Sequence, residues 1–219
     1  ISNGQVVWYG SDGNDTEIFF WDGAAARKLI ESTQGIYDHQ IHNGQVVWKG
    51  EGDIFFWDGT TTRKLNETTH GIFDHQIHNG QVVWSGYVDS PSNLYQEIFF
   101  WNGMSVRQLT SNLNHDHYPK IHNGKVVWIM EIGGNNKVYL WDGTSTRELN
   151  SLTRPVYRVQ IHNGQVVWDS PDIYDNEIFF WDGTSTRQLT NNAYDDSNPQ
   201  IHNGQVAWQG SDGNDNEIF

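Results

Sequence analysis

The groups in this sequence that could do chemistry are carboxylates, imidazoles and aromatic rings, because the chain contains no cysteine. An acidic string near the N-terminus offers the oxygen ligands that calcium prefers, and residues 212–217 repeat it. Its spacing is incomplete for a calcium-binding loop, and turn-forming residues on a solvated hairpin explain the same string. The sequence therefore leaves open a calcium site or an ordinary turn, and no other cofactor is expected. The candidate ligands are Asp12, Asn14, Asp15 and Glu17.

Five histidines each stand directly before an Asn-Gly pair. A ring of five imidazoles could hold a transition metal, because neutral imidazole is a common metal ligand. A hydrogen bond from each imidazole to its own turn explains the same recurrence, and we favour it because the residue is copied with the segment. The five are His42, His78, His122, His162 and His202.

Catalysis needs a nucleophile with a base, paired carboxylates or a metal set within mutual reach. The sequence contains no nucleophile elbow, phosphate-binding loop, His-Glu-x-x-His motif or dinucleotide-binding glycine pattern. One local cluster that does not recur, His115 with Asp116 and His117, is the sole catalytic candidate. We therefore assign no catalytic residue and expect a protein that is not an enzyme.

Aromatic residues that do not recur in every segment are better candidates for ligand binding, since tyrosine supplies rigid, amphipathic contact surface. They fall near one expected edge, where a hairpin of variable length meets the connection into the next segment. Loops on a rigid scaffold often carry binding residues, although the same rings could anchor the loops. The nine candidates are Tyr9, Tyr37, Phe73, Tyr87, Tyr95, Tyr118, Tyr157, Tyr174 and Tyr194.

A repeat of about 40 residues must position all of these groups. From each Trp-(Asp/Asn)-Gly tryptophan to the next Val-Val-Trp or Val-Ala-Trp tryptophan the distance is always 27 residues, whereas the distance onward varies from 9 to 17. All length variation therefore falls in one connection. Its steps of four match a hairpin that grows by two residues on each arm and keeps every side chain on its face.

Each repeat reads as four short strands without helix. Segments such as 45–48 and 54–57 are β-branched and aromatic, while Asn43-Gly44 and Asp58-Gly59 are typical of two-residue hairpin turns. The strands are apolar on both faces, so neighbouring repeats must cover them. Four antiparallel strands per repeat predict an all-β fold, a β-propeller, with residues 1–219 as a single domain.

Two tryptophan series recur with the repeat and are expected to be core aromatics, because large apolar rings dominate the stabilisation of a core. The recurring arginines, Arg27, Arg63, Arg107, Arg147 and Arg187, are interpreted as outward salt bridges. The expected core tryptophans are Trp8, Trp21, Trp48, Trp57, Trp84, Trp101, Trp128, Trp141, Trp168, Trp181 and Trp208.

The repeat resembles the TolB-type, WD40-like (PD40) propeller repeat over the whole chain. The resemblance rests on residues 196–201, the Asn203-Gly204 turn, and residues 177–181 and 187–190 of the neighbouring copy. The family's Asp and Pro before the first strand are present only at Asp116/Pro119 and Asp196/Pro199. The places that should hold them elsewhere carry Ile36 and His39, Ile72 and His75, and Val156 and Val159. The resemblance implies a propeller with a binding face, used as a periplasmic scaffold, sensor or enzyme appendage, and implies no reaction.

Residues 201–219 match residues 1–19 at 15 of the 19 positions. Five blades can form if the inner strand near Ile201 pairs with the strand Val6 to Trp8, which removes free edges. The alternative is six blades, the first without its inner strand and the last without its outer one. We favour five blades, and we expect that the surplus half-blade could pair with another chain.

With 13 Lys and Arg against 27 Asp and Glu, the formal charge is −14, which would repel a nucleic-acid backbone. No apolar run approaches the length of a transmembrane helix, so we expect no membrane insertion. The expected function is an extracellular or periplasmic binding or scaffold propeller that meets a protein or carbohydrate through its variable hairpins. The alternatives are a lectin with sugar sites between blades, or the propeller domain of a hydrolase.

Overall fold

The computed structural model describes residues 1–11, 13, 15–32, 35–67, 69–88, 95–150 and 154–219. Within these ranges every regular element is a β-strand, and each strand pair is antiparallel. No helix there has the length and apolar character needed to cross a membrane. The chain separates into two compact units, Ile1–Ser111 and Asn112–Phe219, and the described residues form three sheets in each. The all-β prediction is confirmed.

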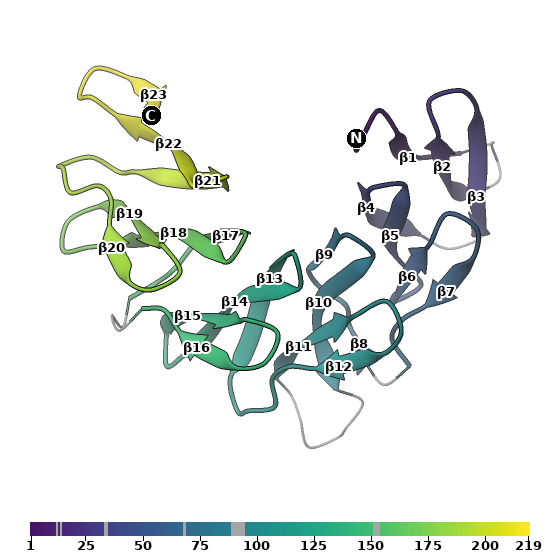
Figure 1. The fold of residues 1–219 in the computed structure, drawn as a ribbon, viewed down its shortest axis with the longest axis horizontal. Helices are drawn as coiled ribbons and strands as arrows, with labels where there is room; N and C mark the ends of the chain where they lie inside the picture. Colours follow the sequence, from purple (N-terminus) through teal and green to yellow (C-terminus); the bar gives the residue numbers. More distant parts are fainter. Residues whose placement is uncertain (12, 14, 33–34, 68, 89–94, 151–153) are drawn as a thin grey trace. The chain divides into compact units, whose positions relative to one another are not determined.

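The first unit contains a three-stranded, a four-stranded and a five-stranded sheet, and chain order sets the strand order in the first two (Figure 1). In the third sheet, β8 and β9 both pair with β10 and together replace a single inner strand. The strands are β1 (Val6–Gly10), β2 (Thr16–Trp21), β3 (Ala26–Ser32), β4 (Ile36–His42), β5 (Gln45–Gly50), β6 (Asp53–Trp57), β7 (Thr62–Lys64), β8 (Thr69–His70), β9 (His75–His78), β10 (Gln81–Val88), β11 (Gln96–Trp101) and β12 (Val106–Gln108).

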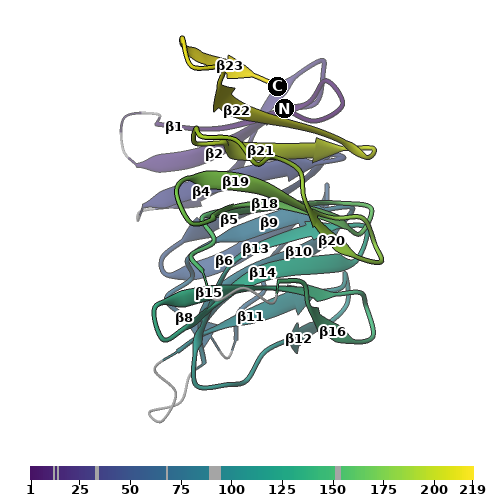
Figure 2. The same cartoon turned by 90° about the vertical axis from the view of Figure 1, so that its left-hand side faces the viewer.

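The second unit contains two four-stranded sheets and one three-stranded sheet, all in chain order. Figures 1 and 2 show β13 to β16 lying side by side in that order. The strands are β13 (His115–His122), β14 (Lys125–Ile132), β15 (Asn135–Trp141), β16 (Thr146–Glu148), β17 (Arg158–His162), β18 (Gln165–Pro171), β19 (Asn176–Trp181), β20 (Thr186–Gln188), β21 (Ser197–His202), β22 (Gln205–Ser211) and β23 (Asn216–Ile218).

The Asn-Gly pairs form two-residue hairpin turns, as predicted. His42 pairs with Gln45, and between them Asn43 and Gly44 have φ angles of 49° and 75°. Both angles lie in the left-handed region, where glycine and asparagine are the least strained residues. The first and second strands of a repeat therefore form one rigid hairpin.

The Trp-Asp-Gly turns differ from the predicted two-residue form. Trp57 pairs with Thr62, so the loop holds four residues, and only Gly59 has a positive φ, 108°. The Asp58 carboxylate accepts the backbone N–H groups of Thr60 and Thr61, both at 2.9 Å. These donors favour the charged carboxylate and so hold the pKa of Asp58 well below its usual range. The ionised aspartate in turn stabilises the loop.

The variable hairpin lengthens without a change of register, which confirms the prediction from its spacing. Trp48 lies opposite Phe55, and the pairing ends two residues later at Gly50 and Asp53. In the longer hairpin Trp128 lies opposite Tyr139, and the pairing continues to Ile132. The tryptophan and its partner ring stack in both, with centroids 5.8 Å apart, so insertions reach only the hairpin end.

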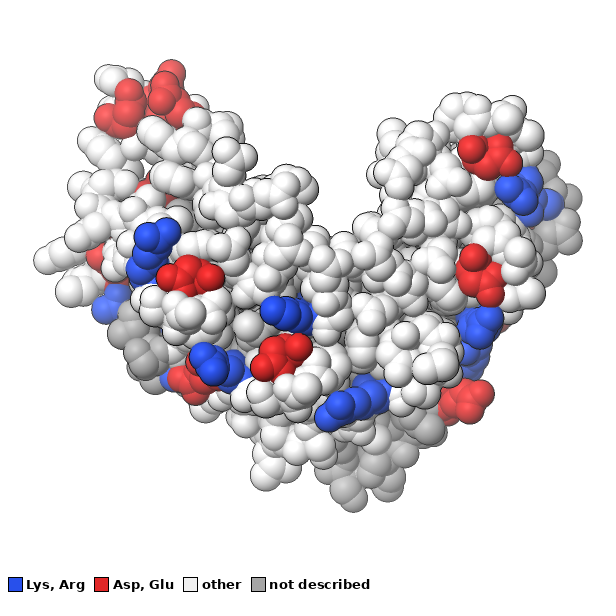
Figure 3. All heavy atoms as spheres, in the orientation of Figure 1, with Lys and Arg blue, Asp and Glu red and all other residues white. Residues whose placement is uncertain are grey.

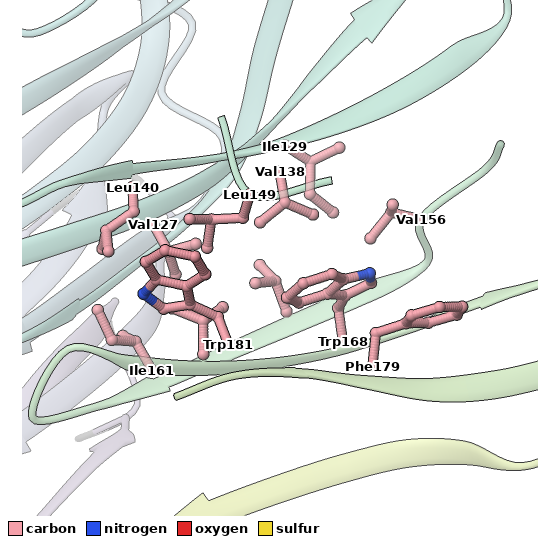
Figure 4. Packing of buried hydrophobic residues seen from close by; sticks show 12 residues of the cluster. Val127, Ile129, Val138, Leu140, Leu149, Val156, Ile161, Trp168, Phe179 and Trp181 are labelled. Carbon is pink, nitrogen blue, oxygen red and sulfur yellow. The ribbon is translucent and has the colours of Figure 1, made fainter. Parts of the chain in front are cut away.

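The core lies between consecutive sheets. In the second unit, Val127 and Leu140 of one sheet pack against Trp168 and Trp181 of the next (Figure 4). In the first unit, Val7, Ile18 and Phe20 of the first sheet form a cluster with Val46, Trp48 and Trp57 of the second. Within each of these two clusters, the tryptophans of the later sheet pack on the sheet that precedes it in the chain.

The tryptophans expected in the core do not all reach it. Trp8 is 36 % and Trp21 37 % exposed, because they lie on the face of the first sheet that does not pack on the second sheet. Trp208 is half-buried. This corrects the expectation that both series are core throughout. Eight are buried: Trp48, Trp57, Trp84, Trp101, Trp128, Trp141, Trp168 and Trp181.

The number of blades stays a prediction, and the strand near Ile201 pairs within its own sheet. β21 pairs with β22, and β1 pairs with β2, so Ile201 lies opposite Val206 rather than a residue of the strand Val6 to Trp8. The strand inventory is that of the alternative: the first sheet lacks an inner strand and the last an outer one. A hairpin partner two residues away closes a far shorter loop than a partner at the other chain end.

A tryptophan pair in the first unit tests the account of the core. Trp57→Ala should lower the free energy of unfolding by about 3–5 kcal/mol, since that ring is buried. Trp21→Ala, at the same repeat position but 37 % exposed, should cost clearly less. Urea unfolding followed by circular dichroism measures the free energy of unfolding of both variants. Equal losses of this free energy would contradict the conclusion that Trp57, and not Trp21, packs between two sheets.

Candidate functional site

Each sheet has two ends with different chemistry. At one end the hairpin from second to third strand meets the start of the first strand: Ile36 pairs with Gly50, and Gly50 with Asp53. We call this end the hairpin edge and the opposite end, with the Asn-Gly and Trp-Asp-Gly turns, the turn edge. The hairpin edge comprises the described residues of the hairpins 9–17, 49–54, 87–96, 131–136 and 170–177 and of the entries 36–39, 72–75, 115–118, 156–158 and 194–198.

The predicted binding aromatics lie at the hairpin edge, and most are exposed. Tyr174, in the β18–β19 hairpin, is 90 % exposed, and Tyr157, which enters the neighbouring strand β17, is 50 % exposed. Tyr87 and Tyr95 are half-buried. The seven exposed members are Tyr9, Tyr37, Phe73, Tyr118, Tyr157, Tyr174 and Tyr194.

Some of these rings also anchor loops, so both interpretations of the sequence apply. Tyr87 meets Phe73 edge to face at 5.3 Å, and Tyr9 meets His39 in the same way at 5.3 Å. Tyr118 has a φ of 52° at a bulge in β13, where the equivalent Asp38 has 54°. Tyrosine is strained in this region, and the bulge turns a ring that is 48 % exposed outward.

Two charged residues at the hairpin edge were not singled out from the sequence. The Lys49 ammonium donates to the Phe73 carbonyl and pairs with Asp38, each at 2.6 Å, which lowers the pKa of Asp38. Asp169 is buried and accepts the backbone N–H of Arg158 at 2.7 Å. Both directly follow a Val-Val-Trp tryptophan, a position that carries a different residue in every repeat. That variability was the available signal.

His42, His122 and His162 at the turn edge bond to the following repeat, which corrects the hypothesis that each histidine caps its own turn. His202 does contact its own turn, through the Asn203 side-chain amide at 3.2 Å. Asn79 donates its backbone N–H to Nδ1 of His42 at 3.0 Å, and Asn163 does the same to His122. The N–H of the first turn residue takes no part in its own hairpin ladder, so it is available to the preceding repeat. Burial lowers the pKa of His42.

The asparagines of the same turns form a second connection. Asn3 donates to Asn43, and Asn43 to Asn79, through their side-chain amides at 2.6 and 2.7 Å. In the second unit, Asn123 donates to Asn163 at 2.7 Å. In His42 and His122 the Nδ1 lone pair accepts a backbone N–H, so it is not available to a metal ion. The hypothesis that five imidazoles form a metal-binding ring therefore loses these two ligands.

The catalytic candidate at residues 115–117 has a structural role. Asp116 is buried, and its carboxylate accepts the indole N–H of Trp128 at 2.8 Å and the amide of Asn112 at 2.6 Å. Asp196 accepts from Trp208 and Asn192 in the same way. The aspartate of the TolB-type pattern thus satisfies a tryptophan donor.

The recurring arginines form the outward salt bridges expected of them in two described repeats. Arg27 pairs with Asp22 at 3.0 Å and Arg63 with Asp58 at 2.8 Å. Arg147 also lies 5.4 Å from the ring centre of Trp181 in the next sheet. Figure 3 shows such basic and acidic side chains next to one another, and exposed pairs of this kind contribute little to stability.

The predicted calcium ligands are only partly described. Asp12 and Asn14 lie outside the described residues, Asp15 is half-buried, and the buried Glu17 pairs with Lys28 at 2.5 Å. The spacing of Asp12, Asp15 and Glu17 recurs at Asp172, Asp175 and Glu177, a copy that sequence reasoning missed. Among the described residues these three bring ligand oxygens within 4.8 Å of one another.

Two cavities lie between consecutive sheets. One in the first unit, of about 490 Å³, is lined by Asn66, Trp101 and Gln108, among others. One in the second unit, of about 200 Å³, is lined by Arg147 and Trp181. Trp101 and Trp181 stand at the same position of the repeat, but the other residues that line the two cavities stand at different positions. The two cavities are therefore not copies of one site.

No family model and no curated protein matches the chain. Among solved structures, it resembles the β-propeller domain of the Trilobed protease from Pyrococcus furiosus, with a TM-score of 0.66 and 11 % identity over 98 % of this chain and 74 % of that one. A putative TolB from Agrobacterium tumefaciens matches with 0.55 and 14 % over 87 % and 75 %. A chain of a nidogen/laminin complex matches with 0.50 and 13 % over 94 % and 88 %.

These likenesses, with the antiparallel sheets, define the chain as a β-propeller fold. The neighbours include a protease propeller, a TolB protein and a chain from a protein complex, so the fold occurs with different functions. The chain spans 40 % of an acylaminoacyl peptidase that it also matches.

The histidine contacts predict a pH dependence of stability. Burial lowers the pKa of His42 below its usual value of 6.5, so the folded chain favours the neutral imidazole. The contribution of the neutral His42 to the free energy of unfolding is therefore complete above about pH 6.5, and it is lost as the pH falls through the folded-state pKa. The melting temperature should therefore fall between about pH 7 and pH 5.

His42→Asn should show a smaller fall, since its amide oxygen can accept the Asn79 N–H without titrating. His202→Asn, an exposed equivalent, is the control and should keep the wild-type slope. If His42→Asn kept that slope as well, the contact would not be the cause.

Proposed function

We propose that this protein is a non-enzymatic binding propeller that recognises a protein partner through its hairpin edge. The observation that carries the proposal is the group of exposed aromatic residues at the hairpin edge of each unit, where no ring is present in every repeat. They are Tyr9, Tyr37 and Phe73 in the first unit and Tyr118, Tyr157, Tyr174 and Tyr194 in the second. Exposed aromatic rings are enriched where proteins bind proteins, since a ring buries much area at low entropic cost.

Two further features support a binding role. In the one local catalytic candidate, His115 with Asp116 and His117, the Asp116 carboxylate is engaged by hydrogen bonds from Trp128 and Asn112. A nidogen/laminin complex supplies one of the similar folds. With the resemblance to the TolB-type repeat, we place the protein in the periplasm or outside the cell.

Selection from a displayed library of random peptides tests the hairpin edge. Peptides selected on the wild-type chain should bind the double variant Tyr157→Ala/Tyr174→Ala at least about tenfold more weakly. Met104→Ala, which removes an 84 % exposed side chain at the turn edge, should leave their Kd unchanged. Selected peptides that ignore the tyrosine variant, or lose equal affinity on Met104→Ala, would contradict the proposal.

A carbohydrate ligand is the second candidate, favoured by the cavity of about 490 Å³ between two sheets of the first unit. Its lining combines a tryptophan face with amide groups, the surfaces on which a sugar stacks and forms hydrogen bonds. A glycan array should then give a signal that Val106→Trp, which fills the cavity from an exposed position, removes. A third alternative, the propeller domain of a hydrolase, is favoured by the likeness to the protease propeller.

Self-association through the incomplete sheets is part of the same proposal. In the sheet order, β1 has a partner on one side only, and an unpaired strand edge is a template for another chain. Light scattering on a gel-filtration column should show a mass that rises above 25.2 kDa with concentration. Tyr9→Lys, which places a charge on that edge, should lower it. A mass of one chain at every concentration would contradict self-association.

A further inference from the structure

The hairpin between β18 and β19 gathers three carboxylates in a small space. Pro171 pairs with Asn176, and the four loop residues between them include Asp172 and Asp175. Asp172 accepts the Tyr174 N–H at 2.7 Å, and its own N–H donates to the Asp175 carbonyl at 2.8 Å. These bonds close the loop and place Asp172 beside Asp175 and Glu177, with one oxygen of each within 4.8 Å of the others.

Asp175 is unsatisfied at this place. Each of its two carboxylate oxygens has less than 1 Å² of accessible surface, and neither has a hydrogen-bond partner. Leaving an ionised carboxylate buried without a donor or cation is costly. Burial together with the nearby charges of Asp172, Asp195 and Asp196 raises the pKa of Asp175, so the folded chain surrounds this group with repulsion.

The neighbouring groups do not supply the missing positive charge. Glu177 is fully buried and accepts the Thr190 hydroxyl at 2.5 Å and the Asn192 N–H at 3.1 Å, both neutral donors. The Tyr174 N–H is the main cause that lowers the pKa of Asp172, and the charge of Arg154 adds to it, but the Arg154 guanidinium donates to the Pro171 carbonyl at 3.1 Å. Among the described groups, Arg154 is the cation whose charge reaches the cluster.

In the first sheet, the carboxylate equivalent to Glu177 has a cationic partner. There the buried Glu17 pairs with Lys28, in the strand alongside. The position of Lys28 in the repeat is occupied by Gln188 next to Glu177. The repeat thus keeps the acidic residue and replaces its lysine with a neutral side chain.

We propose that Asp172, Asp175 and Glu177 bind one calcium ion in the β18–β19 hairpin. All three ligands are carboxylates, which suit a hard cation rather than zinc or nickel. Oxygens up to 4.8 Å apart can lie on opposite sides of an ion with bonds of about 2.4 Å, whereas magnesium needs about 2.1 Å. The bound ion neutralises Asp175 and holds the loop that carries the exposed Tyr174.

Calorimetric titration of the full chain with calcium chloride, after treatment with a chelator, tests the site against a matched variant. Asp175→Asn should lower the number of calcium ions bound per chain by one. Glu131→Gln removes an exposed carboxylate of the same unit and should leave that number unchanged. Magnesium chloride should give no binding that depends on Asp175.

Thermal melting separates a calcium ligand from a residue that merely supports the fold. In chelator, Asp175→Asn should melt higher than the wild type, because the variant removes one of three crowded carboxyl groups. Saturating calcium should raise the wild-type melting temperature by about 5 °C or more and raise that of Asp175→Asn by less. Equal calcium stoichiometry in both chains, or an equal calcium shift, would overturn the proposal, and neither result bears on the partner proposed for the tyrosines.

Discussion

The rest of the structure depends on the need of each sheet to cover two apolar faces. A strand such as Val46-Val47-Trp48 has no exposed face, so a lone sheet would leave half of this surface in water. Packing the tryptophan face of each sheet on the preceding sheet removes it and repeats the same contact along each unit. Trp8 and Trp21 lie on the face of the first sheet that does not pack on the second sheet, and they stay more than a third exposed.

Stacking also leaves two edges that tolerate sequence changes to different degrees. At the turn edge, residues such as His42 and Asn79 bond from one repeat to the next, so a change in one repeat disturbs its neighbour. At the hairpin edge, insertions of four residues leave the Trp48–Phe55 and Trp128–Tyr139 register unchanged. Variation is tolerated there, and the non-recurring aromatic residues lie there.

A repeat can acquire a new site by losing one charge. Glu17 and Glu177 occupy the same buried position, yet one pairs with Lys28 and the other faces Asp172 and Asp175. Glu17 and Glu177 stand at the same position of the repeat, and the residue beside them in the neighbouring strand changes from Lys28 to Gln188, which removes a positive charge from the neighbourhood of the carboxylate. Asp116, one of the three residues of the catalytic candidate, has a structural role instead. Its carboxylate accepts the indole N–H of Trp128.

The sequence by itself determined the all-β class, the four-strand unit, the Asn43-Gly44 turn and the constant register, because these follow from local turn chemistry and the two-residue period of strands. It also placed the candidate aromatics at one edge. Only the tertiary structure decided that Trp8 is exposed, that His42 bonds to the next repeat, that the two carboxylate oxygens of Asp175 are covered without a hydrogen-bond partner, and that β21 pairs with β22. Each of these depends on which groups from distant repeats meet in space, and the recurrence of a residue says nothing of what lies across the next sheet.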